Sequence, residues 1–343
     1  MPSSQPDVYA RTTWEGRNLT QLTALWEQYV ASSALARVCP KVGVGFFYYE
    51  SLGATIRGAK AIAPINKGER LCNVPVRELL SGYTVGNSSL LPVMQWALSP
   101  AFSLVERPNG SARRRRESVD DRTRIVLYAM RELARERSPQ MPYLQLIRSH
   151  DVSGVPMLWP ESSERYRKLT PMARELASRS RNYARAQYDA LILGAIEHFP
   201  APLSEGLGCT APVCLRSHLE RIYGWERFLY LFAIISARDW VLPVDGENRA
   251  FLAPVLDMLN FGQVGIRAEF NVALQGFVAT ATAPIAQGSE LLFYYGTMCQ
   301  DAWINLYGFA PAEARPCRSP NRATGGSSMN KSVNQRARAK KSS

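Results

Sequence analysis

The chain has 343 residues, of which 46% are hydrophobic and 20% charged, and its formal net charge is +12. This balance is typical of globular proteins and excludes a wholly disordered chain, while the length predicts one elaborated domain or two. The best apolar run, residues 228–237, is much shorter than the roughly 20 residues of a membrane span. We therefore expect a buried helix there and no membrane partner.

Residues 1–40 are predicted to be a polar leader followed by a helix. The helix is indicated by apolar residues at helical spacing, namely Leu19, Leu22, Leu25, Trp26, Tyr29 and Val30. Acidic residues and the lack of a long apolar segment disfavour a secretory signal, and disfavour a transit peptide less strongly. We expect a cytoplasmic or nuclear location, and a plastid location stays open.

The cysteines and histidines show no metal-ligand spacing. Six cysteines are scattered without a Cys-x-x-Cys pair, and only three histidines are present. The sequence therefore predicts no metal site and reduced, buried or idle thiols.

Residues 43–80 are predicted to be β-rich. Short apolar runs at 43–49, 59–63 and 70–75 are separated by glycine or proline. The segment 65–69 has glycine where a left-handed turn needs it, so we expect the two runs on either side of it to form a hairpin.

The middle of the chain, from about residue 85 to 238, is predicted to be a mainly helical insert. It starts with a loop at 82–121 that contains four consecutive arginines, 113–116, which we interpret as a solvated charge run. Helices are expected at 122–137, 165–190 and 221–238.

The last folded part, residues 250–310, is again β-rich. Residues 268–272 and 276–283 resemble strands, and 284–290 repeats the glycine turn before a strand at 291–294. A short helix is expected at 300–306. The order of strands, helices and strands predicts an α+β fold.

The C-terminal end carries most of the excess charge. Residues 310–343 contain eight Lys or Arg and one acid, so this segment carries +7 and the rest of the chain +5. Its polar composition predicts a disordered basic tail over 311–343, with a nuclear address or a weak polyanion contact as the alternative. Because the body is only mildly basic, nucleic acid is disfavoured as a partner.

Four segments in order resemble the SET methyltransferase domain: residues 55–69, 236–240, 255–260, and 288–296 with 306–309. The subfamily they resemble includes Rubisco large-subunit lysine methyltransferase and actin-histidine methyltransferase, which share the helical insert. The resemblance implies a SET domain at 41–310, built from small curved sheets with a pseudoknot and interrupted by the insert. It also implies S-adenosylmethionine as cofactor and a protein side-chain nitrogen as methyl acceptor.

The resemblance also assigns cofactor-binding positions along the chain. They are Thr55, Ile56, Arg57, Arg238, Asp257, Met258, Leu259, Asn260, Phe261, Tyr307, Gly308 and Phe309. The sequence departs from the family pattern in two places: Thr55-Ile56 replaces Glu-Gly, which predicts a locally different loop, and Phe261 replaces a histidine.

Each of the main assignments has a structural alternative. Arg238 would pair with the cofactor carboxylate, or it could cap the end of its own helix. The segment Tyr307-Gly308-Phe309 would cover the adenine ring, or it could be a helix cap with packing.

Tyr295 is the residue that the resemblance implies for catalysis, with its hydroxyl beside the transferring methyl group. Tyr294 is expected on the opposite face of the strand, and both rings could instead be core residues.

Lysine is favoured over histidine as the methyl acceptor. Trp240 is expected to form an apolar wall, which suits an aliphatic lysine stem better than an imidazole that needs a hydrogen bond. Histidine methylation is the first alternative, and a catalytically silent SET fold that acts as a binding module is the second. In the relatives a helical domain follows the Tyr-Gly-Phe segment, so we expect either another substrate-binding surface here or a truncated gene model.

Overall fold

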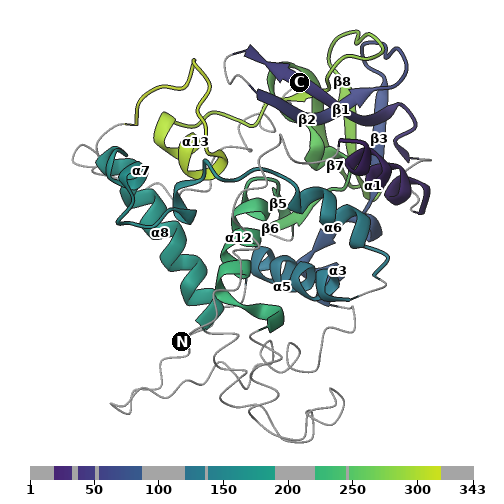
Figure 1. Ribbon diagram of the computed structural model, residues 1–343. Coiled ribbons are helices and arrows are strands. Elements are labelled where there is room, and N and C mark those ends of the chain that lie inside the picture. The colour runs from purple at the N-terminus through teal and green to yellow at the C-terminus, as the bar shows by residue number, and fades with distance from the viewer. Residues whose placement is uncertain are drawn as a thin grey trace, which may run out of the picture.

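The structure is a computed structural model in which three small β-sheets adjoin a group of helices (Figure 1). It describes residues 19–32, 38–50, 54–86, 120–135, 138–189, 221–244 and 247–317. The arginine run at 113–116, Cys209 and Cys214 lie outside the described residues. The predicted α+β class, with helices inserted between two β-rich parts, is confirmed.

The first sheet is a hairpin of β1 (Val42–Tyr49) and β2 (Ala54–Ala61), paired from Val42↔Ala61 to Tyr49↔Ala54. The predicted hairpin across residues 65–69 is therefore wrong. The turn exists, with Gly68 at φ +80°, but the strand after it joins a different sheet. A turn sequence fixes where the chain reverses, whereas the strand partner is chosen by long-range packing.

The second sheet has the order β3-β8-β7-β9 and combines the two β-rich parts of the sequence. Its strands are β3 (Arg70–Pro75), β7 (Asn260–Asn271), β8 (Gly276–Ala281) and β9 (Leu292–Phe293). The short β9 runs parallel to the start of β7, with Asn260 opposite Leu292 and Phe261 opposite Phe293. The sequence predicted this strand only from residue 268, so it missed that the Asn260 motif opens a strand.

The third sheet has the order β4-β6-β5 and lies next to the helices. Its strands are β4 (Leu80–Ser81), β5 (Trp240–Val244) and β6 (Glu247–Leu252). The 3₁₀ turn η3 (Val76–Glu78) leads into β4, and the short helix α3 (Gly82–Gly86) follows it. Beyond β6 the chain forms the 3₁₀ turn η7 (Leu256–Met258) and then enters β7.

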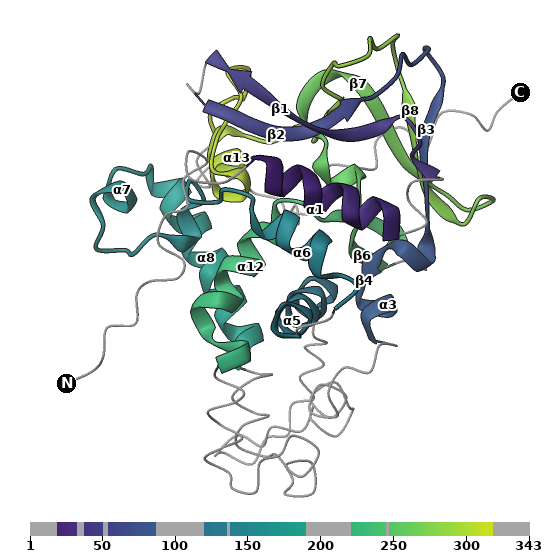
Figure 2. The same ribbon diagram turned by 45° about the vertical axis from the view of Figure 1, so that its right-hand side comes forward.

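In the view of Figure 2, the helical insert lies below β1 and β2. Its described elements are α5 (Asp121–Ala134), α6 (Met141–Arg148), the 3₁₀ turn η5 (Pro156–Leu158), α7 (Glu164–Arg167), α8 (Pro171–Tyr188) and α12 (Trp225–Ser236). The side chain of Asp120 caps α5 by accepting from the amide of Thr123, as expected of an N-cap aspartate. The apolar run at 228–237, which was predicted to form a buried helix, lies mostly in α12, and this helix is buried along most of its length. The helix predicted at 19–30 is α1 (Leu19–Ser32), and its Tyr29 ring stacks on Tyr143 of α6 at 5.0 Å.

The two glycine turns, at residues 65–69 and 284–290, are hydrogen-bonded to each other and bring distant segments together. Ile65 and Ile285 exchange backbone hydrogen bonds of 2.9 Å in both directions, and Gly288 has φ +84°, as Gly68 does in the first turn. The amide of Leu291 then donates to the carbonyl of Ala59 at 2.8 Å. The segment leading to β9 therefore lies against β2 on one side and the start of β7 on the other.

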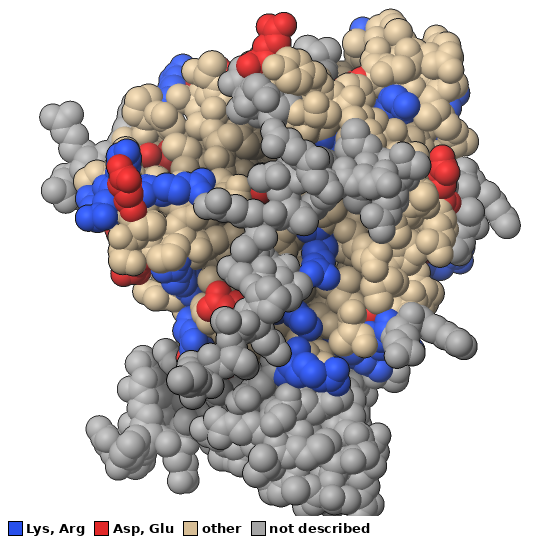
Figure 3. All heavy atoms as spheres, viewed as in Figure 1, with Lys and Arg blue, Asp and Glu red and all other residues tan. Residues whose placement is uncertain are grey.

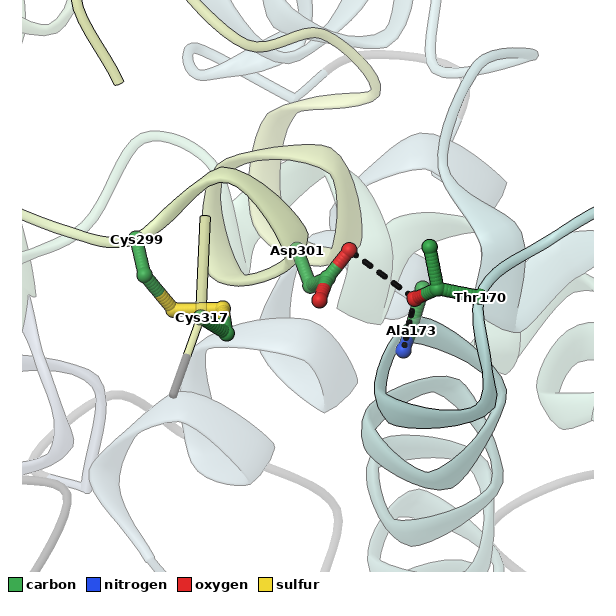
Figure 4. The surroundings of a disulfide bond; sticks show 5 residues. All are labelled: Thr170, Ala173, Cys299, Asp301 and Cys317. Atoms are coloured by element: carbon green, nitrogen blue, oxygen red, sulfur yellow. Dashed lines mark hydrogen bonds between the residues drawn. A yellow bond between two sulfur atoms is a disulfide. The ribbon is translucent and has the colours of Figure 1, made fainter. Parts of the chain in front are cut away.

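Helix α13 (Gln300–Tyr307) is fastened at its N-terminal end by two contacts. Cys299 forms a disulfide with Cys317, and buried Asp301 accepts a hydrogen bond of 3.0 Å from Thr170, the residue that caps α8 (Figure 4). A second disulfide joins Cys39 to Cys72. The prediction of idle thiols is thus wrong for four cysteines, because partners 18 and 33 residues apart become neighbours only through the fold.

On the face shown in Figure 3, the described Lys and Arg side chains do not form one continuous basic surface. In the view of Figure 1, Lys and Arg side chains form separate groups among uncharged surface (Figure 3). Residues 311–317, which the sequence assigned to the tail, lie against α13, since the amide of Gln300 donates to the carbonyl of Arg315 at 2.7 Å. Within the described parts, none of the helices combines the length and the apolar character that crossing a membrane requires.

Candidate functional site

Asn260, the first residue of β7, is fixed by hydrogen bonds to two other segments. Its Nδ2 donates to the carbonyl of Arg57 at 2.9 Å and to Oε1 of Glu290 at 2.7 Å. Gly58 makes this approach possible, because a Cβ there would lie 2.7 Å from Nδ2 and 2.5 Å from Oε1. Gly58 is thus needed for close packing rather than for an unusual φ.

Arg238 and Asp257 form a buried polar group next to Asn260. Arg238 Nη1 donates to the backbone carbonyl of Asp257, and Nη2 lies 2.9 Å from Nδ1 of His150. Tyr143 donates to Asp257 Oδ2 at 2.7 Å. Burial raises the pKa of Asp257, while the positive charge of Arg238 and the hydrogen bond from Tyr143 act in the opposite direction. The Arg238 side chain therefore bonds to η7 and to the turn that follows α6 rather than to the carbonyls at the end of its own helix.

The backbone that carries Asp257 contains an unusual conformation. Val255 has φ +77°, a region that β-branched residues avoid. The 3₁₀ turn η7 follows it directly, and both its last residue, Met258, and the next residue, Leu259, are buried. Strained backbone of this kind is typical of functional sites, where the surrounding structure holds it in place.

Tyr295 lies at the boundary between the polar group and a cluster of aromatic rings. Its hydroxyl donates to the carbonyl of Leu259 at 2.6 Å, one residue before Asn260. Its ring lies 5.0 Å from Tyr307, 5.8 Å from Phe261 and 6.0 Å from Trp303, measured between centroids. Burial raises the pKa of Tyr295 far above its usual value, so the hydroxyl stays protonated.

Tyr294 lies at the surface, as predicted, although the strand expected to place it there, β9, ends at Phe293, before both tyrosines. Its side chain is 46% exposed, and its hydroxyl bonds to Thr297 at 2.8 Å. The two adjacent tyrosines therefore have different surroundings, one inside the site and one at the surface.

The segment Tyr307-Gly308-Phe309 ends α13 and packs on the same rings. Gly308 adopts the left-handed conformation at φ +81°, and its amide caps the carbonyl of Ile304. A Cβ at Gly308 would lie 2.7 Å from the carbonyl carbon of Gly154, so two backbones cross here in direct contact. The predicted helix cap is thus present, and it places Tyr307 beside Tyr295.

The remaining predicted site residues lie around this centre. Thr55 and Ile56 are half-buried residues of β2, opposite Tyr48 and Phe47, so the stretch predicted to be a divergent loop is a regular strand. The Arg57 side chain turns inward and donates to Ser149 Oγ at 2.7 Å and to the carbonyl of Leu146.

Trp240 is separated from Tyr295 by one aromatic ring, that of Phe293. It packs on Phe293 at 4.6 Å and on Phe277 at 4.7 Å, and Phe293 in turn neighbours Tyr295 at 6.2 Å. Its predicted role as a wall for the substrate stays a prediction.

Contacts join most of the predicted residues into one site. Arg238 bonds to Asp257 and lies 3.8 Å from Met258 Sδ, and Leu259 bonds to Tyr295. Sequence reasoning missed several residues that complete this site, namely Tyr49, Tyr143, His150, Glu290 and Trp303. Trp303 could have been found from its position one helical turn before Tyr307, whereas the others are far from their partners in sequence. Among the described residues, no group of three or more His, Cys, Asp and Glu side chains is placed to hold a metal ion.

Comparisons with known proteins agree with this architecture. No family model matches the chain. It is 26% identical over 291 residues to N-lysine methyltransferase SETD6 of Rattus norvegicus, covering 82% of this chain and 54% of that protein. It is 24% identical over 258 residues to the Homo sapiens protein of that name, covering 74% and 47%. The chain thus spans about half the length of these relatives.

Solved structures share the fold at low sequence identity. The SET domain of LSMT bound to lysine and AdoHcy superposes with a TM-score of 0.55 at 13% identity, covering 86% of this chain and 58% of that one. Rubisco LSMT bound to AdoMet gives a TM-score of 0.50 at 12% identity, covering 85% and 57%. The resemblance found in the sequence is confirmed, and the chain has the fold of the SET-domain protein methyltransferases.

Proposed function

We propose that this protein is an S-adenosylmethionine-dependent protein methyltransferase that acts on lysine. One observation carries the proposal: the Tyr295 hydroxyl is anchored on the Leu259 carbonyl, at the point where the polar group around Asn260 meets the aromatic rings. A polar site for the cofactor and a ring-lined site for the acceptor would meet at this hydroxyl.

The relatives support the same chemistry. The curated relatives are named N-lysine methyltransferases, and the solved structures are described with AdoMet, AdoHcy and lysine bound. Because the chain covers only about half of the relatives' length, their activity and substrate class enter here as part of the proposal.

The residues present fit the cofactor. S-adenosylmethionine would supply an electrophilic methyl group on a sulfonium, together with a carboxylate, an ammonium and an adenine ring. Arg238 offers a guanidinium for the carboxylate, and its Nε is buried with no hydrogen-bond partner among the described residues. Asn260 offers Oδ1 as an acceptor, and Tyr307 and Phe309 offer ring faces.

Tyr295 would act as a fixed neutral dipole. Because its proton is donated to the Leu259 carbonyl, the hydroxyl can offer only its oxygen lone pairs to the reacting groups. Its raised pKa excludes a role as a general base near neutral pH. Its contribution is therefore positioning and electrostatic stabilisation, which are large terms when the group is preorganised.

The acceptor nitrogen must lose a proton before it attacks. A lysine amine has a reference pKa of about 10.4, so only a small fraction is neutral at pH 7. The rings of Trp240 and Phe293 beside Tyr295 would form an apolar surrounding that favours the neutral amine. We expect turnover to rise with pH between about 7 and 9.

The test is a methyl-transfer assay with radiolabelled S-adenosylmethionine and cell extract as acceptor, with acid hydrolysis of the product to identify the methylated amino acid. Tyr295→Phe should lower turnover by about 10²–10³, as for loss of one preorganised electrostatic contact, with cofactor affinity almost unchanged. Tyr294→Phe is the matched control and should do much less, because its hydroxyl is at the surface.

Three results would contradict the proposal in different ways. Equal rates for Tyr295→Phe and wild type would remove the catalytic assignment. Methylhistidine in the hydrolysate would favour histidine as acceptor over lysine. Cofactor binding without any transfer to extract proteins would favour the silent binding module.

A further inference from the structure

Glu290 occupies a position where four segments of the chain converge. Its carboxylate accepts from Asn260 Nδ2 through Oε1 at 2.7 Å and from the Tyr49 hydroxyl through Oε2 at 2.8 Å. Its backbone forms a bridge with Lys60 of β2. The side chain therefore connects the end of β1 to the start of β7.

The hydrogen bonds to Asn260 fix the orientation of its side-chain amide. Nδ2 of Asn260 carries two hydrogens, and both are used, one for the Arg57 carbonyl and one for Glu290. The Arg57 carbonyl and the ionised Glu290 carboxylate are pure acceptors, so neither can bond to the Oδ1 end of the amide. Turning the amide over would place three oxygens together, and the orientation with Oδ1 away from them is therefore favoured.

Tyr49 completes the arrangement by holding the other carboxylate oxygen. Burial, followed by the hydrogen bond to Glu290, raises the pKa of Tyr49 far above its usual value, so the hydroxyl remains a donor. Burial also raises the pKa of Glu290, and the hydrogen bonds from Asn260 and Tyr49 oppose this by stabilising the charged form. Asn260 Oδ1 receives no hydrogen bond from the described residues, and it is thus left as the acceptor of this group.

We propose that Glu290 and Tyr49 are positioning residues that fix the Asn260 amide with Oδ1 presented to the cofactor. This inference rests on the proposed function. Neither residue is assigned a contact with the cofactor; both act through Asn260. The close packing at Gly58 leaves little room for the amide to find another position.

The experiment is a double-mutant cycle read by isothermal calorimetry with S-adenosylmethionine. Glu290→Ala should weaken binding about tenfold, equivalent to about 1.4 kcal/mol, which is close to the lower limit for one hydrogen bond to a charged group. Glu290→Gln keeps an acceptor for Nδ2 and should stay within about threefold of wild type. Glu269→Ala, an exposed glutamate of β7 paired with Arg267, is the matched control and should bind like wild type.

The decisive reading comes from the Asn260→Ala background. If Glu290 acts through Asn260, adding Glu290→Ala there should cause almost no further loss, whereas a merely structural role would give an additive loss and overturn the proposal. If Glu290→Ala does not fold, Tyr49→Phe, which removes a single hydroxyl, takes its place in the cycle. Almost no further loss in the Asn260→Ala background would again support the proposal, and an additive loss would overturn it. A wild-type chain that binds no cofactor would overturn the proposed function and this inference together. Normal wild-type binding with an additive cycle would overturn this inference alone.

Discussion

The two halves of the candidate site are built in different ways. The polar half, made of Arg238, Asp257, Asn260 and Glu290, is held by hydrogen bonds between segments far apart in sequence. The aromatic half, made of Tyr295, Trp303, Tyr307 and Phe309, is held by ring packing around the single helix α13. Tyr295 joins them through its bond to the Leu259 carbonyl.

This difference indicates how each half should respond to mutation. Hydrogen bonds are directional, so a change in the polar half should alter ligand affinity more than global stability. Ring packing is less directional but buries large apolar areas, so a change in the aromatic half should reduce stability first.

The largest expected effect is on stability, in the aromatic half. Trp303 is only 2% exposed and touches the rings of Phe261, Tyr295, Tyr307 and Phe309. Trp303→Ala should lower the free energy of unfolding by about 3–5 kcal/mol, measured by urea denaturation. Trp303→Phe should cost less, because a ring is kept. A loss of under about 1 kcal/mol in the alanine variant would break the comparison, because the ring cluster would then not hold this half together.

The disulfide that fastens α13 should have the next largest effect. Closing an 18-residue separation stabilises a fold by about 3 kcal/mol in the chain-entropy model. We predict such a loss for Cys317→Ser in a Cys39→Ser/Cys72→Ser background, where reductant acts on this bond alone among the described cysteines. In reductant the loss caused by Cys317→Ser should vanish, and a loss that persists would mean that packing of the serine, and not the bond, is responsible.

The same bond bears on the location proposed from the sequence. A cytoplasmic or nuclear location would keep these thiols reduced in the cell. Thiol alkylation at the moment of lysis, followed by mass spectrometry, measures the paired fraction. Fully paired cysteines would contradict that location.

Sequence reasoning predicted the local features of this fold well and the distant pairings poorly. Helical spacing identified α1, α5 and α12, and both glycine turns were placed at Gly68 and Gly288. The strand after the first turn was given the wrong partner, because pairing depends on contacts that no local pattern records.

The candidate site shows the same limit. Motif order placed Tyr295, Asn260 and Tyr307, which the structure brings together. Glu290 lies within the segment 288–296 that carries the resemblance, but its partner Tyr49 is 241 residues away, so nothing in the spacing could indicate the bond.

A change in the polar half should weaken the binding of the cofactor. Arg238→Ala should weaken S-adenosylmethionine binding by about 1.5–3 kcal/mol, the range for a charge-assisted hydrogen bond, measured by calorimetry. Some stability should also be lost, because the guanidinium bonds to the Asp257 carbonyl and His150. Unchanged affinity in a folded variant would make Arg238 a structural cross-link and would contradict the division between the two halves.

The smallest effect tests the backbone crossing that positions the end of α13. Gly308 and Gly68 have nearly the same φ, +81° and +80°, so alanine at either site should meet a similar conformational cost of about 1 kcal/mol. They differ in their surroundings, since a Cβ at Gly68 meets nothing within 4 Å, whereas one at Gly308 would lie 2.7 Å from the backbone of Gly154. Gly308→Ala should therefore lower the free energy of unfolding by about 1 kcal/mol more than Gly68→Ala, because overpacking adds to the conformational cost. It should also slow methyl transfer, since Tyr307 and Phe309 lie on either side of the crossing. Equal losses at the two glycines would mean that the crossing relaxes freely, and the aromatic half would then be held by its rings and its disulfide alone.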